Sequence, residues 1–280
     1  MTKILLTLFA MAALLGGCTT LDERQRAWIF QPSDRSWSRG DELAQGMSDV
    51  WIDFQSASTR QPVRLHGLWM PHEDHAVRDD APVLLYLHGA RWNVTGSAFR
   101  IRRMQELGFS VLAIDYRGFG KSTNELPSEK LAAEDARAAW DWLARQHPER
   151  PRYIFGHSLG GAIAIDLAAR VDDEAGTLVE GTFTSIADVV SSFRWGWLPV
   201  SPLITQRFES VKRVADIGSP LLVVHGGQDQ LIPPELGRRL FEAATGPKAF
   251  VLVEGGSHHN TNAVGLPQYR VALADLFGLH

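Results

Sequence analysis

The segment GHSLG at positions 156–160 restricts the possible folds more than any other part of this sequence. It follows an apolar run, Tyr153–Phe155, and it opens a stretch rich in alanine and glycine, Leu159–Arg170. A serine on a sharp turn between a strand and a helix needs neighbours without bulky side chains, and the glycines on either side of Ser158 meet that need. The following helix N-terminus favours negative charge that develops nearby. The pattern predicts a strand–turn–helix unit with Ser158 as an exposed nucleophile; the alternative is a glycine-rich turn that only packs a helix.

Short apolar runs alternate with helix-length segments through the rest of the chain. The expected strands are Asp49–Phe54, Val63–Trp69, Val83–Leu87, Val111–Ile114, Tyr153–Phe155, Leu178–Phe183, Leu221–His225 and Phe250–Val253. The expected helices are Ala98–Leu107, Ser128–Gln146, Leu159–Arg170, Pro234–Ala244 and Gln268–Phe277. Apolar strands separated by helices indicate an α/β fold, with a mostly parallel central sheet and helices on both faces. The first two strands flank a turn-rich gap, which predicts an antiparallel hairpin at one edge.

One long connection between strands lacks this regularity. Residues 185–211 contain Trp195, Trp197, Pro199 and Pro202 and are too many for a plain connection, so they predict a short cap segment over the site. A chain of 280 residues is compatible with one domain. We expect that domain over residues 49–280, preceded by a tether and an N-terminal extension over residues 18–48.

The first residues have the composition of a targeting signal. A lysine at position 3 precedes an apolar run of twelve residues, Ile4–Leu15. A helix needs about 20 residues to cross a bilayer, so this run has the length of a signal peptide's apolar segment. Small residues then precede Cys18, the single cysteine of the chain. This resembles the signal of bacterial lipoproteins, which implies removal of residues 1–17, acylation of Cys18 and a lipid anchor in the membrane. Since Thr19 follows, the resemblance implies the cell envelope and an outer membrane facing the periplasm. An ordinary secretory signal and an uncleaved anchor are the alternatives.

Composition excludes some classes of partner. The net charge is −4, and no basic stripe is present to neutralise phosphates, so we expect no nucleic-acid partner. A single cysteine excludes an intramolecular disulfide, and a chain of this length can be stabilised by its core alone.

A carboxylate stands where a partner for a catalytic histidine is needed. Asp229 follows the expected strand Leu221–His225, and the carboxyl ends of parallel strands form the edge at which ligands bind. An aspartate there would orient a histidine and stabilise its cation. Glu180 on the preceding strand is the alternative acid, and a turn role is the alternative for Asp229.

Two adjacent histidines, His258 and His259, follow the last expected strand and a glycine-rich turn. One of them would take the Ser158 proton and return it to the leaving group. Adjacent histidines also suggest a metal, but no cluster of carboxylates or cysteines at metal-ligand spacing accompanies them, so no metal is expected. His72 and His75 lie in a polar loop and are expected at the surface.

The segment DYRGFGKS at positions 115–122 invites comparison with a phosphate-binding loop. The pattern G-x-x-x-x-G-K-[ST] requires a glycine where this chain has Asp115, so a nucleotide site is not predicted.

Four segments stand in a recognisable order: LHGARWN at 87–93, DYRGFGKS at 115–122, GHSLGG at 156–161, and HGGQD at 225–229 followed by GGSHH at 255–259. Together they resemble the α/β-hydrolase superfamily of serine hydrolases over residues 49–280. The segment EGTFTSI at 180–186 is similar to a small-capped esterase and thioesterase-like branch that includes membrane-associated, depalmitoylase-like members. The chain departs from that branch in its oxyanion loop, where Ala90 and Trp92 replace an N-x-x-N-like pattern.

The resemblance implies roles for particular residues. The order serine, acid, base gives Ser158, Asp229 and His258, since relatives place the histidine four residues past the strand; His259 is the alternative base. The backbone N–H groups of Ala90 and Leu159 would form the oxyanion hole.

The implied activity is hydrolysis of an ester or thioester through an acyl-enzyme on Ser158, without a cofactor. The substrate would be a small or acylated molecule, and the apolar segment Phe193–Leu203 favours an apolar acyl group. A peptidase or amidase with the same residues is one alternative. A non-catalytic binding module of the envelope is another.

Overall fold

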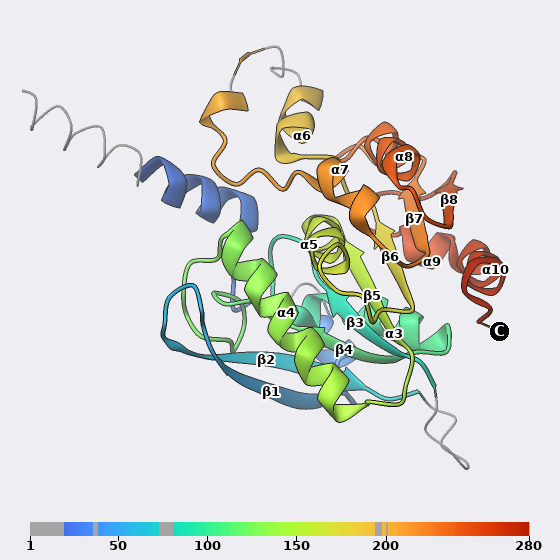
Figure 1. Cartoon of the computed structure of the whole chain (residues 1–280), viewed down its shortest axis with the longest axis horizontal. Coiled ribbons are helices and arrows are strands. Elements are labelled where there is room, and N and C mark those ends of the chain that lie inside the picture. Colours follow the sequence, from blue (N-terminus) through green and yellow to red (C-terminus); the bar gives the residue numbers. More distant parts are fainter. Residues whose placement is uncertain (1–19, 36–38, 73–80, 194–197, 200, 280) are drawn as a thin grey trace, which may run out of the picture.

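A central twisted sheet organises the molecule in the computed structural model, which describes residues 20–35, 39–72, 81–193, 198–199 and 201–279 (Figure 1). Within these residues, eight strands lie in the order β1-β2-β4-β3-β5-β6-β7-β8. They are β1 Ser48–Gln55, β2 Pro62–Met70, β3 Val83–Leu87, β4 Ser110–Ile114, β5 Arg152–His157, β6 Gly176–Glu180, β7 Leu221–Gly226 and β8 Lys248–Val253. β2 is antiparallel to β1 and to β4, and all other pairs are parallel. This confirms the predicted mostly parallel sheet with an antiparallel hairpin at one edge.

Helices cover both faces of the sheet. They are α2 Gly40–Leu43, η1 Val94–Ser97, α3 Ala98–Glu106, α4 Glu129–Gln146, α5 Leu159–Ala168, α6 Ile186–Ser192, η2 Ser201–Leu203, α7 Ser210–Arg213, η3 Val214–Asp216, α8 Pro234–Ala243, α9 Thr261–Val264 and α10 Leu266–Phe277. Successive residues of β3 point to opposite faces. Leu85 belongs to an apolar cluster shared with α4, α5 and α8, and Leu84 to one shared with α3 and α10. Both faces of β3 are therefore buried, which explains its unbroken apolar sequence.

The predicted boundary of β6 is wrong by three residues. A strand was expected over Leu178–Phe183, but it ends at Glu180 because Gly181 turns the chain with a φ of +57°. Glycine adopts this left-handed conformation without steric cost. The turn brings residues 181–184 close to the nucleophile.

The N-terminal extension contains a helix that the sequence analysis did not predict. Residues 20–30 are helical, with Ile29 and Phe30 buried at its end. Residues 1–17 and Cys18 lie outside the described residues. In the part of the chain that the structure describes, no helix has the length and apolar character needed to cross a bilayer.

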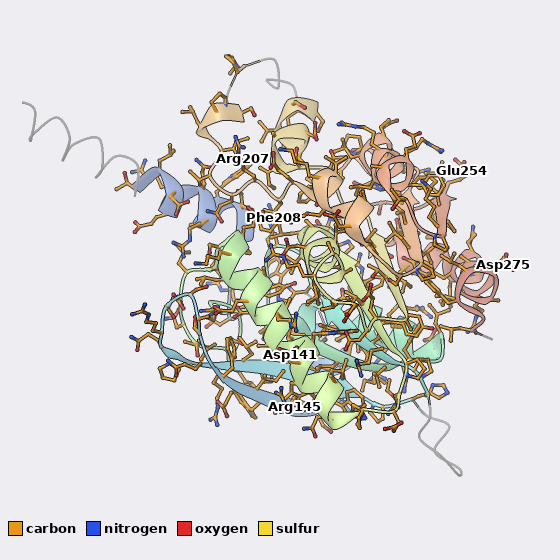
Figure 2. The ribbon with its side chains drawn as sticks, in the orientation of Figure 1. Asp141, Arg145, Arg207, Phe208, Glu254 and Asp275 are labelled. Carbon is orange, nitrogen blue, oxygen red and sulfur yellow. The ribbon has the colours of Figure 1, made fainter. Side chains whose placement is uncertain are left out.

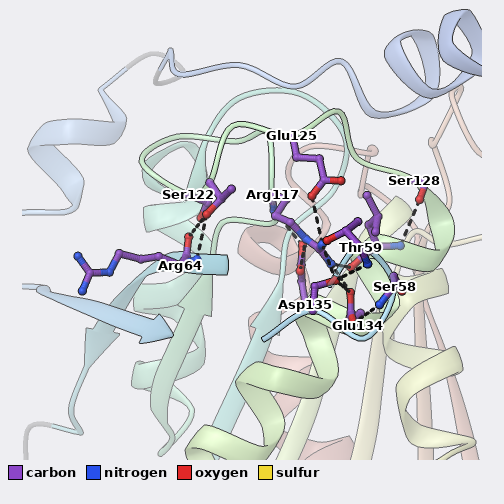
Figure 3. Close-up of polar contacts among 12 residues, drawn as sticks. Ser58, Thr59, Arg64, Arg117, Ser122, Glu125, Ser128, Glu134 and Asp135 are labelled. Atoms are coloured by element: carbon purple, nitrogen blue, oxygen red, sulfur yellow. Dashed lines mark hydrogen bonds and ion pairs between the residues drawn. The ribbon is translucent and has the colours of Figure 1, made fainter. Parts of the chain in front are cut away.

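The loop after β4 is fixed by a buried arginine (Figure 3). Arg117 is fully buried and donates to Asp135 on α4 at 2.8 Å, to Glu134 at 2.6 Å and to Glu125 at 3.2 Å. Because the guanidinium has carboxylate partners on several sides, its charge is compensated despite burial. The loop over residues 115–128 is thereby attached to α4.

The segment between β6 and β7 lies beside the N-terminal helix. In Figure 1, α6 and η2 stand away from the sheet at the top of the view, near the helix over residues 20–30. The side chain of Gln25 joins the two regions: its Nε2 donates to the Leu203 carbonyl at 2.7 Å, and its Oε1 accepts from the Thr205 N–H at 2.9 Å. Trp195 and Trp197 lie outside the described residues.

Candidate active site

Ser158 occupies a strained turn between β5 and α5. Its φ is +55° and its ψ is −121°, a conformation that is costly for any residue other than glycine. The flanking glycines permit it: a Cβ on Gly156 would lie 2.2 Å from the Gly160 carbonyl oxygen, and a Cβ on Gly160 would lie 2.1 Å from the Leu87 carbonyl oxygen. Because β3, β5 and α5 approach one another so closely here, both positions that flank the strained serine turn must be glycine.

Two hydrogen bonds to residues of β6 and the turn after it hold the backbone of Ser158. Its N–H donates to the Glu180 carbonyl at 2.9 Å, and its carbonyl accepts from Thr182 Oγ1 at 2.8 Å. Both partners come from the end of β6, so the shortened strand and the Gly181 turn fix the serine. The side chain of Ser158 is half-buried.

His258 and Asp229 complete a continuous set of hydrogen bonds with Ser158. His258 Nε2 lies 3.0 Å from Ser158 Oγ, and His258 Nδ1 lies 2.7 Å from Asp229 Oδ2. A carboxylate at Nδ1 assigns the proton there, which leaves Nε2 to accept the serine proton. The loops that carry the two residues are joined directly, since the Gln228 N–H donates to the Gly256 carbonyl at 2.8 Å.

Asp229 is held in its ionised form. Burial alone would raise its pKa, but hydrogen bonds from His225 and His258 and the N–H of Ile232 outweigh burial, and the pKa of Asp229 is well below its ordinary value. Its Oδ1 accepts from the N–H groups of Leu231 and Ile232 at 2.9 and 2.8 Å. The carboxylate is therefore an anion facing His258 at neutral pH.

The alternative candidates lie elsewhere in the network. His259 is exposed, and its ring meets that of His258 edge-on at 5.4 Å. Glu180 is fully buried and pairs with Arg100 Nε at 3.0 Å, while its other oxygen accepts from Tyr269 Oη at 2.5 Å. Glu180 thus pairs with a cation, and Asp229 is the carboxylate at His258.

Arg100 on α3 is a site residue that sequence reasoning missed. It is buried, and its Nη2 donates to the carbonyls of His258 and His259 at 3.2 and 3.1 Å. His157 Nε2 lies 3.0 Å from the same His258 carbonyl. The buried Arg100 thus holds the backbone of the loop that carries His258 by hydrogen bonds, and Glu180 compensates the charge of the guanidinium.

His157 is neutral in this setting. Burial lowers its pKa well below the ordinary value, and the charge of Arg100 lowers it further. A neutral ring beside Arg100 avoids a second buried cation.

The loop after β3 borders the nucleophile. A Cβ on Gly89 would lie 3.1 Å from the Cβ of Ser158, which places residues 88–90 against the turn. Ala90 is half-buried, and Leu159 is the first residue of α5, so its N–H has no acceptor within the helix. His88 is buried, and Tyr116 Oη donates to its carbonyl at 3.1 Å.

A cavity between α4, α5 and residues 205–213 does not contain this site. It has a volume of about 930 Å³, and its walls lack Ser158, Asp229 and His258. Asp141 and Arg145 on α4 and Arg207 and Phe208 beyond η2 line it (Figure 2). Its charged side chains include ion pairs such as Arg137–Asp141 and Arg170–Asp166. Among the residues that the structure describes, no group of three or more His, Cys, Asp or Glu side chains is arranged to hold a metal ion.

The proteins that this chain resembles include hydrolases. The family model described as "Serine aminopeptidase, S33" matches residues 79–210. The chain is 34% identical over 259 residues to the uncharacterized protein MT2364 of Mycobacterium tuberculosis (strain CDC 1551 / Oshkosh), covering 91% of this chain and 88% of that protein. It is 32% identical to the lysophosphatidylserine lipase ABHD12 of Danio rerio, over 71% of this chain and 56% of the lipase, so it spans little more than half of that relative.

Solved structures share the fold. The esterase Pf2001 of Pyrococcus furiosus superposes with a TM-score of 0.67 at 19% identity, covering 88% of this chain and 97% of the esterase. Family model, relatives and fold together show that this chain belongs to the α/β-hydrolase superfamily of serine hydrolases.

Proposed function

We propose that this chain hydrolyses ester or thioester bonds through an acyl-enzyme on Ser158, with His258 as general base and Asp229 as its carboxylate partner. The observation that carries the proposal is the unbroken set of hydrogen bonds from Ser158 Oγ through His258 to Asp229. It stands at the carboxyl edge of a parallel sheet, where α/β enzymes bind their ligands.

These contacts determine the order of the proton transfers in the reaction. His258 Nε2 takes the hydroxyl proton as Ser158 Oγ attacks the carbonyl carbon, and it then gives that proton to the departing alcohol or thiol. The product of this half-reaction is an ester on Ser158. Water enters, His258 removes its proton, and the collapse of the second intermediate returns the proton to Ser158 and frees the acid. Asp229 stabilises the imidazolium in both halves.

Backbone groups would stabilise the negative oxygen of each intermediate. We assign this role to the N–H groups of Leu159, at the N-terminus of α5, and of Ala90, in the loop against Ser158. The partial positive charge at the start of α5 favours the same oxygen.

The cap supports an apolar acyl group as the substrate class. Phe193, Leu198 and Leu203 of the predicted cap segment are exposed by 42, 42 and 59%, so they are available to contact an apolar acyl chain. The name of the ABHD12 relative, a lipase of lysophosphatidylserine, points the same way. Lipid esters with one acyl chain are therefore the first natural substrates to test.

Amide cleavage is the second candidate, because the matching family model is described as a serine aminopeptidase. The same three residues can cleave an amide if the leaving amine is protonated by His258. A pure binding module is less well supported, since Ser158 adopts a strained backbone that binding alone does not require.

Lipid anchoring at Cys18 remains part of the proposal. The single cysteine follows an apolar run and two glycines, as in bacterial lipoprotein signals, and would fix the enzyme to the outer membrane facing the periplasm. Metabolic labelling with a fatty-acid probe should mark the parent protein and not Cys18→Ser; an unlabelled parent would reject the anchor.

Activity is tested with the full-length chain in detergent, on p-nitrophenyl esters of increasing acyl length and on the matching anilides. We expect ester turnover that rises with acyl length and falls by several orders of magnitude in Ser158→Ala. Turnover of anilides at equal rates would favour the amidase. Turnover that survives in Ser158→Ala would contradict the mechanism.

A further inference from the structure

The loop over residues 88–93 has a conformation that its own sequence does not favour. Arg91 and Trp92 have φ values of +69° and +58°, although neither is glycine, and both side chains are exposed. Consecutive left-handed residues of this kind cost roughly 1–2 kcal/mol each. Contacts from outside the loop must therefore maintain it.

Those contacts come from the N-terminal extension. The Arg91 N–H donates to the Phe30 carbonyl at 2.9 Å, and the Asn93 N–H donates to the Arg35 carbonyl at 3.2 Å. Arg91 Nε donates to Gln31 Oε1 at 2.8 Å, and Asn93 Nδ2 donates to the Asp34 carbonyl at 3.0 Å. Residues 30–35, which we call the brace, thus hold both sides of the two strained residues.

The brace is itself anchored in the body of the protein. Phe30 is fully buried, and its ring meets that of Phe208 at 5.8 Å. Arg26, one helical turn earlier, donates to the Pro127 carbonyl at 2.9 Å and to the Leu126 carbonyl. The Gly120 N–H donates to the Ser33 carbonyl at 3.1 Å. The brace is therefore fixed to the body of the protein by contacts of its own.

We infer that the brace positions the oxyanion hole, with Gln31 as a positioning residue that acts through Arg91 on the N–H of Ala90. The inference rests on the proposed function, because it needs Ala90 to be an oxyanion donor. Gln31 touches neither Ser158 nor His258. Its Oε1 restrains the Arg91 side chain, and its Nε2 donates to the Trp28 carbonyl at 3.0 Å, which orients the amide.

The substitution Gln31→Gly tests this inference without disturbing the backbone. Gln31 has a φ of +47°, which glycine adopts more readily than glutamine, so the fold should tolerate the change. Arg60→Gly is the matched control: Arg60 also has a positive φ, +59°, is exposed, and lies in the turn between β1 and β2. Both variants are made in the full-length chain and assayed with p-nitrophenyl butyrate.

Removing one oxyanion donor outright costs about 10²–10³ in kcat, so loosening its support should lower kcat by about tenfold. We expect that loss in Gln31→Gly, with KM within about twofold and the melting temperature unchanged, and no loss in Arg60→Gly. Gln31→Glu keeps an acceptor for Arg91 and should retain most of the activity. Because both groups act through one contact, Arg91→Gly should add little to Gln31→Gly.

The outcomes separate this inference from the proposed function. If the parent protein hydrolyses the ester through Ser158 but Gln31→Gly matches it, the brace is only structural and the inference is wrong. A raised KM with unchanged kcat would place the brace at the substrate instead, and would also overturn it. No esterase activity in the parent would remove the proposed function itself.

Discussion

The two loops that flank Ser158 are held in different ways. The base loop, residues 254–260, is held from inside the molecule, where the buried Arg100 grips the carbonyls of His258 and His259. In the proposed oxyanion loop, residues 88–93, Tyr116 holds the start from inside, and the brace at the end of the N-terminal helix holds residues 91–93 from outside. The proposed base therefore lies on a loop that the core of the fold holds, whereas Ala90, one of the two proposed oxyanion donors, lies on a loop that also bonds to an extension preceding the sheet.

The largest expected effect comes from breaking the base loop at its functional side chain. His258→Ala should lower kcat by several orders of magnitude, because among the described residues only the His258 side chain is hydrogen-bonded to Ser158 Oγ. His259→Ala is the control on the same loop and should change kcat by less than about tenfold. Steady-state turnover of a p-nitrophenyl ester measures both. A larger loss in His259→Ala would move the base to that residue.

Replacing the buried Arg100, which holds the base loop, should destabilise the folded protein. Arg100→Met leaves Glu180 as an unpaired buried charge, which typically costs about 3–5 kcal/mol in the free energy of unfolding. Arg103→Met is the control on the same helix, where the pair with Glu106 is solvent-exposed and worth about 1 kcal/mol or less. Denaturant unfolding measures both.

A second substitution distinguishes charge from packing at this position. Adding Glu180→Gln to Arg100→Met removes the orphaned carboxylate, so the double variant should regain part of the lost stability. Equal stability of the single and double variants would mean that Arg100 matters only by its volume.

Hydrogen exchange compares the two loops directly. The N–H of Gly256 in the base loop donates to the Val253 carbonyl on β8, whereas those of Arg91 and Asn93 donate to the N-terminal extension. We expect Arg91 and Asn93 to exchange at least about tenfold faster, because an extension packed outside the sheet opens locally more often than the sheet itself. Equal protection would mean that both loops belong to one cooperative unit.

The smallest effect concerns acid pH. The pKa of Asp229 is lowered in the folded protein, so its ionised form stabilises the fold above the unfolded pKa of about 4, and this stability is lost as the pH falls toward the folded value. Between pH 7 and pH 3 the melting temperature should therefore fall further in the parent than in Asp229→Asn. Parallel falls would show that Asp229 is not stabilised as an anion.

Local sequence predicted the parts of the molecule that depend on local chemistry. The apolar run of β3 and the glycines around Ser158 are required wherever a strand is buried or a turn is tight, so they could be read without a structure. The order of motifs also predicted that Asp229 and a histidine of the 258–259 pair would approach Ser158. The resemblance favoured His258 over His259, and in the structure His258 Nε2 lies 3.0 Å from Ser158 Oγ.

The supports of the site could not be predicted, because they depend on contacts between distant residues. Arg100 lies in an amphipathic helix, where a charged residue is expected to face water, and its partner Glu180 is 80 positions away. The brace lies in a polar segment whose composition resembles that of a tether. Its role as a support depends on hydrogen bonds to residues 91–93, which are far away in the sequence. Neither contact leaves a local pattern.

Labelling with a fluorophosphonate tests the central claim most directly, because the reagent forms a stable adduct only with an activated serine. The full-length parent, Ser158→Ala and His258→Ala are treated in parallel, and intact mass and peptide mapping locate the adduct. The account predicts one adduct on Ser158 in the parent, none in Ser158→Ala and strongly slowed labelling in His258→Ala. An unlabelled parent, or an adduct on another residue, would contradict it.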